Sequence, residues 1–152
     1  MKQDGCVFCD RDGLRTADVY VENAFCVYAW TRDPRDPLDV LPGCGVIVPI
    51  AHRASPLDFT AEEWAVTHEL LLAAKAEQDK RLAPDGYTLI WNCFVPEADR
   101  PALNARLHVI PRFDDEPLAN HGGRSAIKAP ENRRPDPFRS GSGRARPFGN
   151  SE

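Results

Sequence analysis

The alternation of apolar and polar positions divides the chain into short strands and one long helix. Segments rich in β-branched and aromatic residues predict strands. They lie at 19–30 (two runs broken near Glu22 and Asn23), 46–50, 87–91 and 105–110. Residues 61–82 instead repeat apolar side chains every three or four positions, which is the period of a helix. This order of elements predicts an α+β fold, in which an antiparallel sheet carries the helix on one face.

Local signals mark the ends of the predicted helix and suggest which side is buried. Thr60 and Glu63 form a capping box at the start, and Pro84-Asp85-Gly86 ends the helical pattern. One stripe combines apolar residues with a histidine and a lysine, and we expect it to face the core with the histidine packed there. Its members are Trp64, His68, Leu71, Leu72 and Lys75.

After Arg112 the sequence loses both periods and becomes rich in proline and glycine. Residues 117–152 hold seven basic and three acidic side chains, a charge of about +4, whereas the rest of the chain carries about −8. We therefore expect one domain over 1–128 and a basic, flexible tail over 129–152. The tail is either a solvated terminus or a segment that contacts a partner.

Composition narrows the class of protein further. No stretch approaches the roughly 20 apolar residues of a membrane helix, and no apolar run follows Lys2, so we expect a cytoplasmic protein. The net charge of −4 gives no general attraction to nucleic acid or an anionic membrane. Five cysteines, an odd number, argue against a disulfide framework. Buried thiols are expected at Cys26, Cys44 and Cys93.

Four short motifs, taken in order, resemble the histidine-triad (HIT) superfamily over residues 6–128. They are Cys6-Val7-Phe8-Cys9, the Pro-Gly, strand, Pro-x-x-His pattern of 42–52, the Gly-Tyr strand that ends in Asn92, and Leu107-His108-Val109-Ile110-Pro111-Arg112. The resemblance implies a five-stranded antiparallel sheet with one long helix. It also implies a homodimer formed through that helix and a neighbouring strand, with Trp64 and Leu72 extending the contact. The ligand implied is a nucleotide whose α-phosphate lies against the triad strand.

The triad itself departs from the family pattern of three alternating histidines. The corresponding positions are Asn104, Arg106 and His108, which share one face because alternate residues of a strand point the same way. In the family the middle histidine attacks phosphorus. Arg106 is permanently protonated and has no lone pair to donate, although a guanidinium holds phosphate well. Residues 98–101 and Cys44-Gly45 also differ from the residues that the family pattern has at the corresponding positions.

These departures leave two functional hypotheses. The first is a HIT-like nucleotide- or phosphate-binding protein without the usual histidine nucleophile, whose ligand-binding residues are Asn92, Asn104, Arg106 and His108. The alternative is a divergent nucleotide hydrolase or nucleotidyltransferase, acting on a dinucleoside polyphosphate or phosphoramidate, with His108 as catalytic acid or base. His108 is otherwise a residual histidine that is hydrogen-bonded for structural reasons.

A structural zinc site is implied by the same resemblance. Some bacterial members bind zinc with residues that correspond to Cys6, Cys9 and His52, and tetrahedral zinc favours sulfur and nitrogen ligands. The fourth ligand would correspond to Asn104, a poor zinc ligand, so water, His121 or another residue would complete the shell. Otherwise Cys6 and Cys9 are ordinary reduced thiols.

Overall fold

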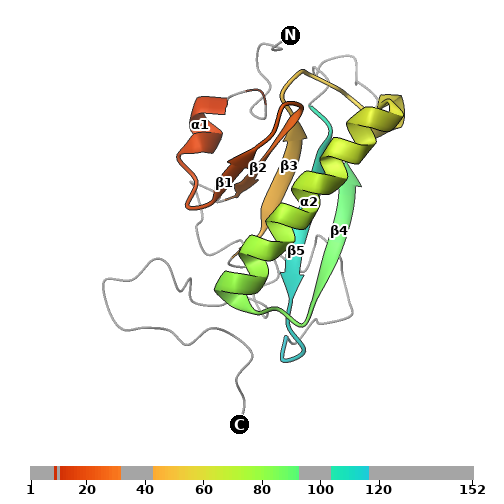
Figure 1. The fold of residues 1–152 in the computed structure, drawn as a ribbon. Coiled ribbons are helices and arrows are strands. Elements are labelled where there is room, and N and C mark those ends of the chain that lie inside the picture. Colours follow the sequence, from red (N-terminus) through yellow and green to blue (C-terminus); the bar gives the residue numbers. More distant parts are fainter. Residues whose placement is uncertain (1–8, 10, 32–42, 93–103, 117–152) are drawn as a thin grey trace, which may run out of the picture.

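The computed structural model describes residues 9, 11–31, 43–92 and 104–116. Within them, five strands form one antiparallel sheet in the order β1-β2-β3-β5-β4, and a long helix crosses one face of it (Figure 1). The strands are β1 (Tyr20–Glu22), β2 (Cys26–Trp30), β3 (Gly45–Pro49), β4 (Gly86–Asn92) and β5 (Arg106–Arg112), and the helix is α2 (Ala61–Leu82). The predicted α+β architecture is confirmed, as are the strand positions. The proposed boundary between domain and tail lies outside the described residues.

Helix α2 begins as its capping box predicts. The Glu63 amide donates to the Thr60 hydroxyl at 3.1 Å, and the Thr60 amide donates to the Glu63 carboxylate at 3.3 Å. The helix ends at Leu82, and its cap residue Ala83, left-handed with φ of 46°, comes directly before the Pro84-Asp85-Gly86 segment that predicts the end. Both ends of the helix therefore follow from local sequence signals.

The buried side of α2 is not the one that the apolar stripe predicts. Leu71 packs against the core, but His68 is exposed, and Trp64 and Leu72 are 39% and 52% exposed, so the prediction that the stripe faces the core is wrong. The buried residues are instead Thr67, Leu70, Ala74, Gln78 and Leu82. The polar residues Thr67 and Gln78 can be buried because their side chains donate hydrogen bonds to protein acceptors. The Thr67 hydroxyl, for example, donates to the Glu63 carbonyl at 2.7 Å.

A buried amide joins α2 to the sheet beneath it. The Gln78 side chain donates to the Tyr28 hydroxyl at 2.7 Å and to the Gly43 carbonyl at 2.6 Å. Tyr28 is completely buried, and burial raises the pKa of its phenol above the ordinary value. Gly45 lies directly against the Tyr28 ring, where a side chain would not fit. This contact fixes the start of β3 under the helix.

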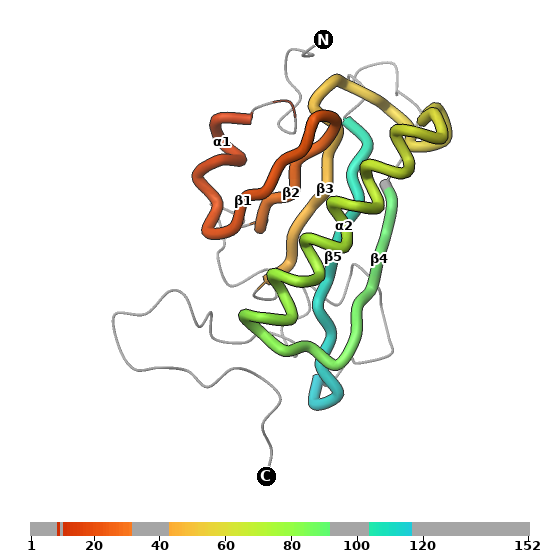
Figure 2. Tube along the Cα trace, viewed as in Figure 1, coloured from red at the N-terminus to blue at the C-terminus, as the bar shows by residue number. Residues whose placement is uncertain are grey.

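Two short elements have no counterpart in the sequence predictions. They are α1 (Arg11–Arg15) and the 3-10 turn η2 (Pro56–Asp58). Helix α1 lies beside β1 and β2 (Figure 2), held by an ion pair of 2.5 Å between Arg11 and Glu22. Its Leu14 packs on valines of β2 and β3 that point away from α2. None of the helices in the described ranges has the length and apolar composition that a bilayer crossing requires.

Candidate functional site

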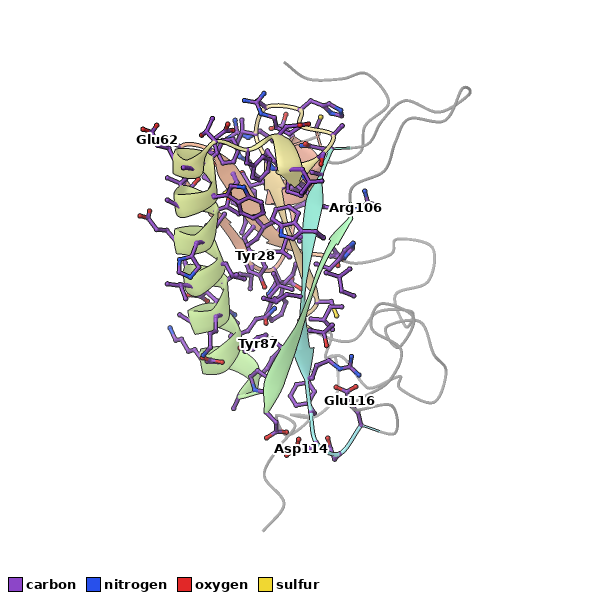
Figure 3. The ribbon with its side chains drawn as sticks, turned by 90° about the vertical axis from the view of Figure 1, so that its right-hand side faces the viewer. Tyr28, Glu62, Tyr87, Arg106, Asp114 and Glu116 are labelled. Atoms are coloured by element: carbon purple, nitrogen blue, oxygen red, sulfur yellow. The ribbon has the colours of Figure 1, made fainter. Side chains whose placement is uncertain are left out.

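Strand β5 carries the candidate residues on the face of the sheet that points away from α2. Leu107 and Val109 belong to the core under the helix, so Arg106 and His108 point to the opposite side. Figure 3 shows the labelled Arg106 on the side of the sheet away from α2. Arg106 is buried, with 6% of its surface exposed, and His108 is half-buried. The sequence prediction that these two residues share a face is confirmed.

The neighbouring strands surround His108 with apolar side chains. Val46 of β3 and Ile90 of β4 are its register partners on either side. Arg106 is the register partner of Asn92 at the end of β4; the Asn92 side chain lies outside the described part of the chain. The face therefore presents one imidazole between aliphatic groups, with a guanidinium one step further along the strand.

An apolar cluster adjoins these polar groups. Val27, Val46 and Val48 form a buried cluster on the same face, and partly buried side chains pack against it. Those side chains are Leu14 of α1, Tyr20 of β1 and Ile50. A cationic group beside apolar side chains matches a ligand that has both an anionic and an apolar part.

Asn104 lies at the entry to β5 and is completely buried. Its Nδ2 donates to the Pro49 carbonyl at 2.7 Å, and its Oδ1 accepts the Arg53 amide at 2.8 Å. Both ends of the amide are thus bonded to backbone at the end of β3 and just after it. The sequence prediction made Asn104 a ligand-binding residue, and these contacts show a structural role as well.

Arg112 extends the same face but is neutralised by an acid that the sequence analysis missed. Its guanidinium meets the Glu116 carboxylate through Nε at 3.1 and 3.2 Å and through Nη2 at 3.0 Å. The Glu116 carboxylate also accepts a hydrogen bond from the Phe113 amide at 2.7 Å. The spacing of four residues between Arg112 and Glu116 was the sequence signal from which this ion pair could have been predicted. This pair closes the turn after β5, so its charge is balanced locally.

The predicted zinc ligands are partly brought together. The Cys9 sulfur lies 3.3 Å from Nδ1 of His52, close to the roughly 3.5 Å expected between sulfur and nitrogen ligands on one tetrahedral zinc ion. Cys6 and His121 lie outside the described residues. Within the described ranges, no three histidine, cysteine or acidic side chains converge as a metal site. Cys9 and His52 therefore fit two of the four positions, while the Asn104 amide is committed to backbone.

The remaining cysteines follow the sequence prediction where the structure describes them. Cys26 and Cys44 are buried, as expected, and Cys93 lies outside the described residues. Burial raises the pKa of the Cys26 thiol to about 11. Cys26 packs in the core with Leu107 and Val109, on the face opposite Arg106 and His108, so it has no part in the candidate site.

Comparisons with solved structures find the same fold in several histidine-triad proteins. A HIT family protein from Bacillus anthracis superposes with a TM-score of 0.55 at 20% identity, covering 74% of this chain and 76% of that one. A zinc-bound histidine triad family protein from Mycobacterium smegmatis gives 0.56 at 19% identity, covering 77% and 81%. A hypothetical histidine triad nucleotide-binding protein from Sulfolobus tokodaii gives 0.55 at 16%, covering 72% and 70%. No protein-family model and no curated sequence matches the chain.

The chain has the HIT fold. This follows from the sheet order, the one long helix of the described residues and the agreement with these structures, and it confirms the fold that the four motifs implied. At identities of 16–20%, the likeness concerns the fold. What the site does is argued below from this chain's own residues.

Proposed function

We propose that this protein binds a nucleotide on the face of β5 and holds its phosphate with Arg106 and His108, without forming a covalent intermediate. The observation that carries the proposal is the placement of these two side chains on one face beside the apolar cluster of Val27, Val46 and Val48. A guanidinium offers paired N–H donors that match two phosphate oxygens. The partly buried side chains packed on this cluster, Leu14, Tyr20 and Ile50, would contact the base.

The chemistry of the residue at position 106 limits what the site can do. Nucleotidyl transfer through an enzyme-bound intermediate requires an attacking atom with an available lone pair. A guanidinium stays protonated at any physiological pH, so Arg106 binds charge and does not attack phosphorus. The proposed site is therefore one for recognition of a phosphate ester.

Calorimetric titration with AMP and with adenosine tests this proposal. AMP should bind at one site per chain and more tightly than adenosine, because only AMP presents a phosphate to Arg106 and His108. Equal affinities for the two ligands would remove the phosphate contact, and no affinity for either would leave the fold without this function.

The alternative is a divergent nucleotide hydrolase or nucleotidyltransferase, and one observation favours it. His108 keeps part of its surface accessible on the candidate face, between Val46 and Ile90. An accessible imidazole is a suitable general acid or base near neutral pH. In such an enzyme, a water molecule or a group of the substrate would be the nucleophile.

We also propose a homodimer formed by the exposed apolar surface of Trp64, Leu72 and Leu89. Trp64 and Leu72 are on α2, and Leu89 is on β4, an edge strand of the described sheet and 49% exposed. The Trp64 and Trp91 rings pack edge to face with centroids 5.7 Å apart, which joins helix and strand into one surface. Apolar side chains exposed side by side commonly mark an interface.

A charge placed in that surface should separate the two copies. We expect Leu72→Glu to give the mass of a single chain of 16.9 kDa by light scattering at micromolar concentration, because the carboxylate would be desolvated in the interface. Leu57→Glu is the control, since Leu57 is 83% exposed and lies in η2, outside the proposed surface. A native protein already monomeric at this concentration would refute the dimer.

We further propose a structural zinc ion, held by Cys9 and His52 with Cys6 as third ligand. Protein purified without chelator should contain about one zinc ion per chain, and Cys9→Ser should lose it because a hydroxyl is a much weaker zinc ligand than a thiolate. The matched control is Cys44→Ser, which changes a buried thiol outside the proposed ligand set and should leave the zinc content unchanged. Metal analysis that finds no zinc in the native protein would contradict the site.

We propose a cytoplasmic location as well. The sequence has five cysteines, an odd number, which argues against a disulfide framework and fits a reducing compartment.

A further inference from the structure

We propose that Asn104 is a positioning residue that sets the place of Arg106 in the sheet. This inference rests on the proposed function, because it concerns how the phosphate-binding side chain is held. It also gives Asn104 a role other than direct contact with the ligand.

On the side of β5 that faces β3, the backbone pairing of the sheet stops just before Arg106. Strand β5 pairs with β3 from Leu107 to Val109, and Arg106 lies one residue beyond the last of these pairs. In the same register Pro49 would face Ala105, and proline has no N–H to donate to a ladder. On the other side, the pair of Arg106 with Asn92 is the last one with β4.

The Asn104 side chain supplies the missing connection. Its Nδ2 donates to the Pro49 carbonyl at 2.7 Å and its Oδ1 accepts the Arg53 amide at 2.8 Å. The next residue adds a third bond, since the Ala105 amide donates to the Arg53 carbonyl at 2.5 Å. The entry to β5 is thus fastened both to the end of β3 and to the segment that follows it.

This arrangement requires a carboxamide at position 104. One end must donate to a carbonyl and the other must accept an N–H, and the side chain is completely buried, so water cannot replace either partner. An aspartate of the same shape would set a carboxylate oxygen against the Pro49 carbonyl. Because the guanidinium contact with phosphate is directional, a shift of the backbone at 104–105 would misalign Arg106.

A double-mutant cycle with AMP as the probe tests this role. Asn104→Ser removes the long amide without adding a charge, and we expect it to weaken AMP binding by about tenfold in calorimetric titration. In an Arg106→Ala background the same substitution should have no further effect. Leu70→Ala, in the core beneath α2, is the control for lost stability and should leave the affinity unchanged.

The outcomes separate this inference from the proposed function. If Arg106→Ala leaves AMP binding unchanged, the proposed function fails. Suppose that Arg106→Ala does weaken AMP binding. If Asn104→Ser then leaves the affinity unchanged, or weakens it equally in the native and the Arg106→Ala backgrounds, Asn104 has no positioning role. Should the serine variant fail to fold, Asn104→Gln keeps the carboxamide but displaces it by one methylene group, and the same cycle applies.

Discussion

Replacing Arg106 by alanine should reduce the affinity for AMP toward that for adenosine. The guanidinium is 6% exposed, so its contact with a phosphate would form largely out of water, where a charged hydrogen bond is strong. Loss of such a contact costs ~2 kcal/mol or more, which is a decrease in affinity of about 30-fold. Adenosine has no phosphate, so its affinity should hardly change.

Arg81→Ala is the matched control for that experiment. Arg81 also carries a guanidinium, but it lies on α2, pairs with Glu77 at 3.1 Å and stacks over Trp30. Calorimetry should therefore give the native affinity for AMP. If the Arg106 and Arg81 variants bind AMP equally well, the phosphate does not contact Arg106.

Replacing Gly45 by valine should destabilise the fold strongly. A Cβ at this position would lie 2.8 Å from the Cζ and hydroxyl atoms of Tyr28 and closer still to Cε2. The ring is completely buried and its hydroxyl accepts a hydrogen bond from Gln78, so it has little room to move. Overpacking costs ~1–3 kcal/mol, and disturbing the buried hydrogen bond adds ~1–3 kcal/mol.

Urea unfolding measures this effect, with Gly86→Val as the matched control. Gly86 starts β4, and a Cβ there would meet nothing within 4 Å, so valine should be tolerated in the strand. The midpoint should fall for the Gly45 variant and stay near the native value for the Gly86 variant. Equal midpoints would show that the Tyr28 ring yields easily.

The elements that the sequence predicts well are those with local signals. The capping box and the period of apolar residues define α2, and runs of β-branched residues define the longer strands. Helix α1 and turn η2 have five and three residues, too few for a period to emerge. The exposed position of His68 was missed because Thr67 and Gln78 reach the core although both are polar.

The candidate site was predicted only where it depends on strand geometry. Alternation along β5 is enough to place Arg106 and His108 on one face. The contacts of Asn104 reach Pro49 and Arg53, which are 55 and 51 positions away in the sequence. No local pattern indicates such a pairing, since it depends on how β3 and β5 meet in the folded sheet.

The most direct test of a HIT fold without its covalent step is turnover of an adenosine phosphoramidate, followed as release of AMP by chromatography. We predict no release above the uncatalysed rate. Arg106 has no lone pair to offer, and His108 is displaced by about 6–7 Å along the strand at ~3.3 Å per residue, beyond the ~3–3.5 Å of a near-attack geometry. Robust release of AMP by the native protein, abolished by His108→Ala, would contradict this account.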